Sequence, residues 1–160
     1  MPNIFWAAGK LGRVIVGRFR PGDDLLNALE NLAREAGLTS GIILSGVASL
    51  RKAVLRNPKG FLTEFPITEE YRYAAEIEGP LELTNLTGNI ATGADGRVIV
   101  HAHATVSAGE KGGAAWGGHL LPGCIIYTTA EVVLAGLEGM KLCRREDDLT
   151  KGEELFPEKA

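Results

Sequence analysis

The sequence predicts an α+β fold, built from a mostly antiparallel β-sheet with one flanking helix. Short runs rich in valine, isoleucine, leucine and threonine recur along the 160 residues, and 21 glycines punctuate them. This pattern is typical of many strands joined by tight turns. Only one segment, early in the chain, repeats its apolar residues at helical spacing. A succession of strands with a single early helix favours the α+β class.

The helix is predicted at about residues 23–36, where apolar side chains recur every three or four positions. Asp23 and Asp24 stand at its start, where capping and the helix dipole favour acidic side chains. Gly37 follows its last apolar residue, as is usual at the C-terminal end of a helix. The apolar positions are Leu25, Leu29, Leu32 and Ala36.

The strands are predicted from apolar runs that lie between turn signals. Gly79-Pro80 is expected to break one long run into two strands, because proline cannot donate to a ladder. Ala94-Asp95-Gly96 predicts a hairpin turn. In order, the predicted strands are Gly12–Phe19, Gly41–Val47, Leu50–Arg56, Tyr71–Glu78, Leu81–Ile90, Arg97–Ser107, Ala114–Leu121, Gly123–Ala135 and Met140–Arg144.

The length fits one domain, which we place at residues 1–145. Residues 146–160 are acidic, contain Pro157 and have no hydrophobic period. They are therefore predicted to form an acidic C-terminal tail, either loose or serving as an interaction arm.

The composition is that of a soluble globular protein, with 45% apolar and 23% charged residues. No apolar run approaches the length of about 18 residues that a membrane span needs, and the N-terminus lacks the features of a signal peptide. We therefore expect a cytoplasmic protein without a membrane partner. Cys124 and Cys143 are the only cysteines and are expected to be reduced.

The charge balance weakens a DNA-binding interpretation. Lysine and arginine total 17 against 20 acidic residues, which gives a net charge of −3, whereas domains that hold phosphates usually carry a basic face. The small basic clusters are expected to be solvated. They are Arg18/Arg20, Arg51/Lys52/Arg56 and Arg144/Arg145.

The three histidines, His101, His103 and His119, lie close together in the sequence. From 97 to 106 the even positions are apolar, and the odd positions include His101 and His103. Because side chains alternate along a strand, both imidazoles are predicted on one face, about 6.6–6.8 Å apart. That gap lets both side chains converge on one ion.

The face of His119 depends on the register of the following hairpin. If His103 pairs with His119, then Ala108 and Ala114 close the hairpin and Gly109–Gly113 form a five-residue loop. This odd loop puts His119 on the face of His103, whereas an even loop without a bulge would put it on the opposite face. Both registers stay open at this point.

Three imidazoles without a fourth protein ligand predict a divalent transition metal with an open position for water, a small molecule or an anion. Zinc suits such a site best, although imidazole also binds iron, nickel and copper. The alternative is that the histidines are polar-face residues that are hydrogen-bonded to neighbours or exposed. The histidine motif alone does not distinguish a metal site from polar histidines on the sheet face.

Glu131 is a further candidate, because it lies in the otherwise apolar run TTAEVVLAG and a carboxylate there needs a partner. It could orient an imidazole ligand or accept a proton near the metal. An ion pair with an arginine, including one across a subunit interface, is the alternative.

The stretch VHAHATVS, followed by GGHLLPGCIIYTTAEVVL, resembles the plants and prokaryotes conserved (PPC) domain family. The segments GRFRPGDDLLNALENLAREAGLTSGIILSGVASLRKAVLRNP and LELTNLTGNIA are similar to its opening and central strand, so the resemblance covers about residues 10–144. It implies an antiparallel sheet with a flanking helix, assembled as a homotrimer. It also implies a metal, commonly zinc, on His101, His103 and His119.

Two alternatives from other functional classes remain open. Members of the PPC family are fused to AT-hooks in plants and labelled DNA-binding in bacteria, so a DNA-binding or transcription-associated module is one of them. The other is a metal-dependent hydrolase-type enzyme with Glu131 or Glu110 as proton acceptor. The cupin superfamily also places H-x-H on a strand, but a glutamate normally follows there within a few residues, whereas Glu110 comes seven residues after His103.

Overall fold

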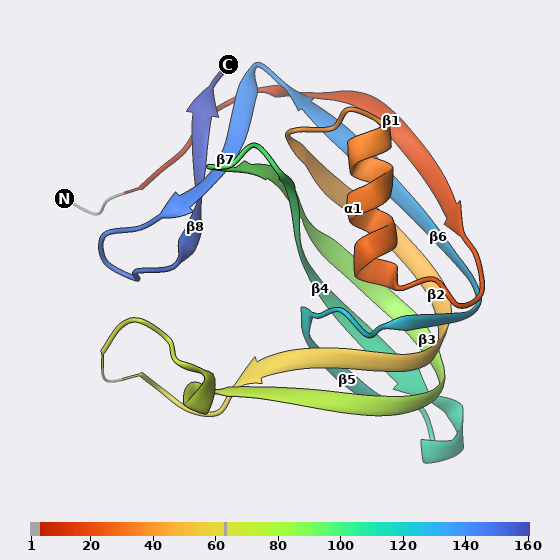
Figure 1. Cartoon of the computed structure of the whole chain (residues 1–160). Helices are drawn as coiled ribbons and strands as arrows, with labels where there is room; N and C mark the ends of the chain where they lie inside the picture. Colours follow the sequence, from red (N-terminus) through yellow and green to blue (C-terminus); the bar gives the residue numbers. More distant parts are fainter. Residues whose placement is uncertain (1–3, 63) are drawn as a thin grey trace.

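The computed structural model describes residues 4–62 and 64–160 and has eight strands in one sheet, with helix α1 packed on one side (Figure 1). The α+β class and the largely antiparallel sheet with one flanking helix are confirmed. The strands are β1 (Lys10–Phe19), β2 (Gly41–Pro58), β3 (Arg72–Gly93), β4 (Val98–Ala108), β5 (Ala114–Leu120), β6 (Ile125–Glu138), β7 (Met140–Glu146) and β8 (Glu153–Lys159).

The strand order is β1-β6-β2-β5-β4-β3-β7-β8, and β2 also pairs with β3. The pairings β2–β3, β3–β4, β4–β5 and β5–β2 therefore form a closed circuit. Within the described residues, β3 and β7 are parallel and the other strand pairs are antiparallel. This circuit surrounds much of the core and holds β4 and β5 in place from both sides.

The prediction that Gly79-Pro80 breaks the strand was wrong, since β3 runs through both residues. The β2–β3 pairing accommodates them by a bulge in β3, where Gly79 and Pro80 lie opposite the single residue Arg51 of β2. A Cβ at Gly79 would lie 2.5 Å from the backbone oxygen of Leu50, so only glycine allows this close approach. The two predicted segments Gly41–Val47 and Leu50–Arg56 are likewise one strand, because β2 continues past its irregularities.

Helix α1 (Leu25–Glu35) confirms the predicted helix to within two residues at each end. Asp24 caps it by accepting a hydrogen bond from the backbone of Asn27 at 3.0 Å. Its buried face consists of Leu25, Leu29 and Ala33. The helix lies close to β1, because a Cβ at Gly17 would come within 2.5 Å of the Leu32 side chain.

The prediction of a loose C-terminal tail was wrong, because Glu153–Lys159 form β8. This strand pairs with β7 from Met140 opposite Lys159 to Glu146 opposite Glu153. Phe156 is buried on it, with the Phe5 ring at 4.8 Å and the Arg145 guanidinium at 4.1 Å. One aromatic side chain thus anchors an acidic segment whose composition alone indicated no strand. The boundary at residue 145 stays a prediction.

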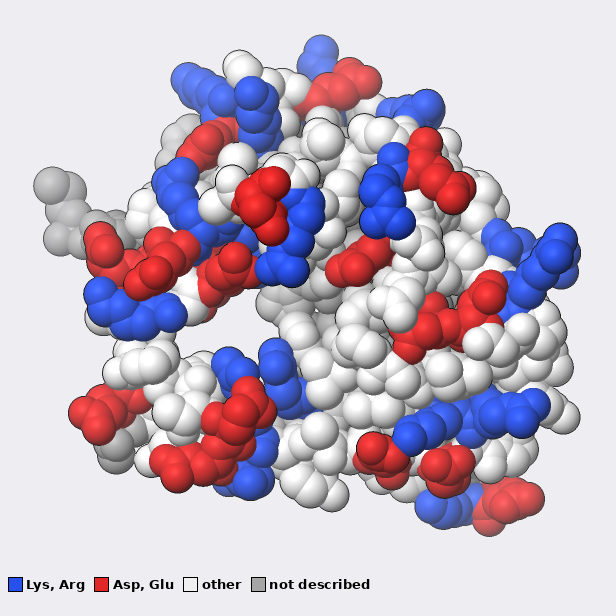
Figure 2. Space-filling model, viewed as in Figure 1, with Lys and Arg blue, Asp and Glu red and all other residues white. Residues whose placement is uncertain are grey.

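Acidic and basic side chains are interspersed over the face of the molecule seen in Figure 2, where no broad basic surface is present. The same view shows a hollow between the β7–β8 hairpin and the loop that joins β2 to β3, with basic side chains on both margins. Over residues 4–62 and 64–160, no helix has the length and apolar content needed to cross a membrane.

We expect Leu29→Ala to lower the free energy of unfolding by about 2–5 kcal/mol, because it leaves a cavity between α1 and the sheet. Leu29 is fully buried (0% exposed), whereas Leu149 is 73% exposed. The matched control Leu149→Ala should therefore change stability by about 0.5 kcal/mol or less. Urea denaturation measures both variants, and equal losses would contradict the placement of α1.

Candidate metal centre

The β4–β5 hairpin has the register that places all three histidines on one face. His103 pairs with His119, and Ala108 pairs with Ala114 at the end of the hairpin. The loop contains the short 3-10 helix η2 (Gly109–Lys111), followed by Gly112 and Gly113 at φ +66° and +78°. Glycine takes these left-handed conformations without strain, so the five-residue loop closes, and the structure decides between the two registers that the sequence left open.

Strict alternation along β4 separates the histidines from the core. Val100, Ala102, Ala104 and Val106 are buried, while His101 is half-buried and His103 is exposed on the other face. On the next strand of the sheet, β3, Asn89 lies opposite His101 and Thr87 lies opposite His103. The prediction that one face of β4 is apolar and the other carries the imidazoles is confirmed.

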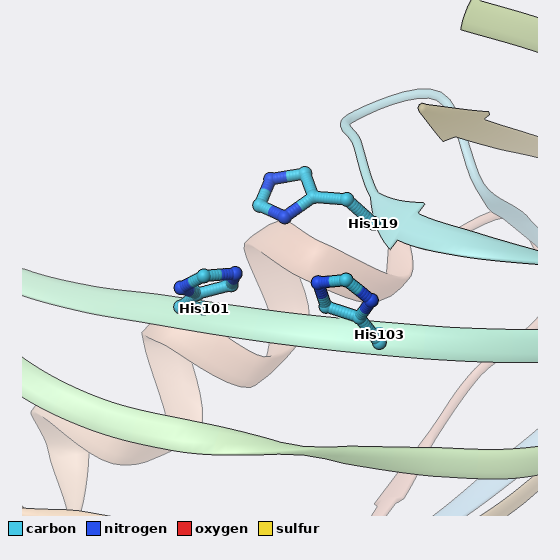
Figure 3. Close-up of side chains that lie close together, drawn as sticks. All are labelled: His101, His103 and His119. Carbon is cyan, nitrogen blue, oxygen red and sulfur yellow. The ribbon is translucent and has the colours of Figure 1, made fainter. Parts of the chain in front are cut away.

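The three imidazoles converge on one space (Figure 3). Their ring centroids are 5.4 Å apart for His101 and His103, 4.8 Å for His101 and His119, and 5.4 Å for His103 and His119. One ring nitrogen from each lies within 4.8 Å of the others. Zinc holds imidazole nitrogens at about 2.0–2.1 Å in a tetrahedral arrangement, so modest side-chain rotations would bring all three onto one ion. The donor set and its spacing fit such an ion.

The surroundings keep two of these rings neutral. Burial, with a smaller effect from Arg56, lowers the pKa of His119 from 6.5 to about 4. Burial, followed by Arg144 and His103, also lowers the pKa of His101. A neutral imidazole keeps a lone pair on one nitrogen, which is the form that binds a metal.

Arg144 contacts the histidines directly from β7. Its side chain is only 7% exposed, and its Nη2 lies 2.8 Å from Nδ1 of His101 and 3.1 Å from Oδ1 of Asn89. Its Nη1 donates to the backbone oxygen of Glu153 at 3.2 Å. Because a guanidinium only donates, Nδ1 of His101 accepts, and the proton of this neutral ring is on Nε2.

The histidines line a pocket of about 540 Å³. Its walls come from β2, β4, β5, β7 and β8, together with the 3-10 helix η1 (Glu69–Tyr71), and it opens into the hollow of Figure 2. Its charged lining consists of the arginines Arg56, Arg72 and Arg144 and the acids Glu153 and Glu154, besides the histidines.

The structure does not bring Glu131 to the histidines. It lies exposed on β6, between Arg18 of β1 and Val47 of β2, and does not line this pocket. Glu110, in η2, does not line it either. Both carboxylates are therefore outside the group that the three imidazoles form.

Sequence reasoning missed the charged groups that do line the pocket. Arg56 lies directly opposite His119 through the β2–β5 pairing, which joins segments far apart in the chain. Glu153 and Glu154 reach the pocket through β8, which was expected to be a loose tail. The local sequence carried no signal for Arg144, because four of the seven residues of β7 are charged.

Comparison with known proteins finds one matching domain family and two curated relatives. The sequence model of the Plants and Prokaryotes Conserved (PCC) domain matches residues 7–138. The bifunctional protein GlmU of Synechococcus sp. (strain JA-3-3Ab) is 40% identical over 147 residues, which cover 92% of this chain and 21% of that protein. The chain thus spans about a fifth of the length of the curated relatives it matches.

Two solved structures share the fold. A plant- and prokaryote-conserved (PPC) protein of Pyrococcus horikoshii is 30% identical, with a TM-score of 0.72 over 95% of this chain and 99% of that chain. A metal-containing protein of Archaeoglobus fulgidus is 24% identical, with a TM-score of 0.76 over 96% and 99% of the two chains.

In protein freed of metal by a chelator, we expect stability to fall as the pH drops from about 6.5 towards about 4. In this window the unfolded chain protonates His119, whereas the folded chain resists, so the unfolded state binds more protons. The contribution of neutral His119 to the free energy of unfolding is fully present above pH 6.5. Urea denaturation at a series of pH values should show a smaller loss for His119→Asn, and an equal loss in both proteins would contradict this assignment.

Proposed function

The chain belongs to the Plants and Prokaryotes Conserved (PCC) domain family, and we propose that it is a metal-binding member of this family. His101, His103 and His119 hold one divalent transition-metal ion, which we take to be zinc. The observation that carries the proposal is the convergence of three ring nitrogens within 4.8 Å on one face of the β4–β5 hairpin. The metal-containing protein of the same fold is in line with it.

When bound, an ion with three imidazole ligands supplies a Lewis acid with a coordination position open to a further ligand. The chain's own residues shape what reaches that position. Arg56, Arg72 and Arg144 line the pocket, and Asn89 lies opposite His101 on the neighbouring strand. These side chains bind and orient a ligand rather than move protons, since arginine stays protonated.

A hydrolase has less support than metal binding alone. The two carboxylates expected to accept a proton, those of Glu131 and Glu110, are outside the pocket. Of the two acids that do line it, Glu153 lies 3.6 Å from Arg97, and Glu154 accepts a hydrogen bond from Thr150 at 3.0 Å. A proton acceptor must reach the reacting group, so we keep the proposal to metal binding.

A DNA-binding module is also less well supported. In the basic clusters, Arg144 is buried, while Arg145 pairs with Glu158 and Lys52 pairs with Glu76. Cations engaged in this way offer little to a phosphate backbone, and the net charge of −3 adds to the mismatch.

We further propose that the protein assembles as a homotrimer through the outer face of β1, β6 and β2. Val14 and Val16 are exposed on β1, and Val47 is exposed on β2. Val16 pairs with Val133 of β6, and Val47 pairs with Glu131 two positions away, so these side chains share one face. An exposed apolar patch of this kind is typical of an interface between subunits.

The proposed location is the cytoplasm. Cys124 and Cys143 are both free thiols, which suits a reducing compartment. Burial raises the pKa of Cys124 to about 11, so its thiol stays protonated and unreactive.

Tag-free protein is expected to contain about one zinc or other transition-metal ion per chain. His103→Ala should lose it, because two imidazoles hold an ion far less tightly than three. Mass spectrometry of metal content measures both. The matched control is Thr105→Ala, two positions along the same face of β4, which should keep its metal. A folded wild-type protein that takes up no metal on titration would refute the proposal.

Val16→Asp is expected to convert the trimer to a monomer, because it puts a charge into the apolar interface. Leu149→Asp is the control, since Leu149 is similarly exposed (73%, against 75% for Val16) but lies in the β7–β8 loop. Analytical ultracentrifugation gives the mass of each assembly. A monomeric wild-type protein, or a trimeric Val16→Asp variant, would contradict this interface.

A further inference from the structure

We propose that the pocket beside the three histidines binds a small oxyanion, a carboxylate or a phosphate, through the guanidinium groups of Arg56 and Arg144. This inference rests on the proposed metal site and names the class of ligand that would lie next to the ion. Guanidinium groups match the planar geometry of carboxylate and phosphate oxygens, and they bind them with short, charge-assisted hydrogen bonds.

Arg56 is a cation without a partner at the wall of the pocket. It lies half-buried on β2, directly opposite His119. Among residues 4–62 and 64–160, no carboxylate oxygen lies within 4.0 Å of its guanidinium, and that group makes no hydrogen bond. Arg72, which lines the same pocket, is instead paired with Glu69 at 2.5 Å. Burial and the nearby Arg72 lower the pKa of Arg56, and the charge of Glu69 offsets this lowering only in part.

Arg144 is a second cation of the pocket without a carboxylate partner within hydrogen-bond distance among the described residues, and it is more deeply buried than Arg56. Its hydrogen bonds go to Nδ1 of His101, to the Asn89 side chain and to a backbone oxygen, all of them neutral groups. Its buried Nε has no hydrogen-bond partner in the part of the chain that the structure describes. A buried charge with neutral partners alone is costly, and an anion in the adjoining pocket would offset that cost.

Metal binding increases the need of Arg144 for an anion, because the contact between Arg144 and His101 must then open. If the ion takes Nδ1 of a neutral His101 ring, it displaces the guanidinium from that atom. If the ion takes Nε2, the ring proton moves to Nδ1 and faces an N–H of Arg144, donor against donor. In both cases Arg144 loses its acceptor on His101. Its guanidinium then lies close to a second positive charge, and an oxyanion is the ligand that compensates both.

Glu154 and Glu153 act on the charge of Arg144 from a distance and partly offset the lowering of its pKa by burial, but neither carboxylate contacts a guanidinium group of the pocket. Within the described residues, neither Glu153 nor Glu154 has a carboxylate oxygen within 4.0 Å of the guanidinium of Arg56 or Arg144. Glu153 is turned towards Arg97, and Glu154 accepts a hydrogen bond from Thr150. The pocket of about 540 Å³ has room for a small ligand, and it opens to solvent at the hollow of Figure 2.

The test is isothermal titration calorimetry of zinc-loaded and metal-free protein with inorganic phosphate and, separately, with succinate, at constant ionic strength. We expect saturable binding of at least one of the two anions. Arg56→Gln should weaken it about tenfold, the usual effect of removing a hydrogen bond to a charged group. The control Arg51→Gln changes an exposed arginine of the same strand that lies outside the pocket, and it should leave the affinity unchanged.

Arg144→Gln tests the second arginine in the same titration and should also weaken anion binding. Its control is Arg145→Gln, which changes the adjacent arginine outside the pocket. Circular dichroism verifies that each variant is folded. A preference for phosphate or for succinate shows whether the pocket selects a phosphate or a carboxylate ligand. No saturable binding of either anion, or equal binding by wild-type protein and Arg56→Gln, would overturn the inference. Metal content of the same samples separates the two proposals, because zinc bound without anion contradicts only this one.

Discussion

The pairing of β4 with β5 is the constraint on which the proposed metal site depends. Side chains alternate along a strand, so a shift of one residue in this hairpin would move His119 to the core face and leave two imidazoles alone. A five-residue loop that ends in two left-handed glycines, Gly112 and Gly113, closes the hairpin in the favourable register. The closed circuit of β2, β3, β4 and β5 then holds both strands from either side. The three imidazoles are therefore brought together before any ion binds.

Arginine side chains lie next to two of the three histidines, in a pocket that Glu153 and Glu154 also line. Metal-ligating imidazoles usually donate their second N–H to a carboxylate or a carbonyl group. Here the neighbour of His101 is Arg144, and that of His119 across the sheet is Arg56. An arrangement that places two guanidinium groups beside three ligands contributes little to stability. The oxyanion that we propose as a ligand accounts for this arrangement, since it would join the proposed metal site and the arginines into one pocket.

Both errors in the sequence-based strand predictions come from pairing between strands, which a single segment does not show. Gly79-Pro80 was expected to end a strand because proline lacks a donor, but a bulge in β3 opposite Arg51 of β2 absorbs the irregularity. The segment after residue 145 was expected to be loose because it is acidic, yet β7 pairs with it and Phe156 is buried. For Gly79-Pro80 the deciding partner is β2, whereas the C-terminal segment is ordered by β7, the preceding strand of its own hairpin, and by the distant Phe5 ring against Phe156. Local pattern carries no information about such a partner.

What the sequence by itself determined is what depends on neighbours a few residues away. The helix follows from apolar spacing and the Asp24 cap, and the face of His101 and His103 follows from alternation, whereas the sequence permitted the observed hairpin register without selecting it. Tertiary structure decided which groups surround the imidazoles. Arg56 meets His119 through the β2–β5 pairing, and Arg144 meets His101 across the site from β7. It also kept Glu131 away, two strands from β5 in the sheet order, because β6 pairs with β1 and β2 instead. The physical reason is that alternation and turn parity act along the chain, whereas charge and burial at the site are set by strands that meet only once the sheet has closed.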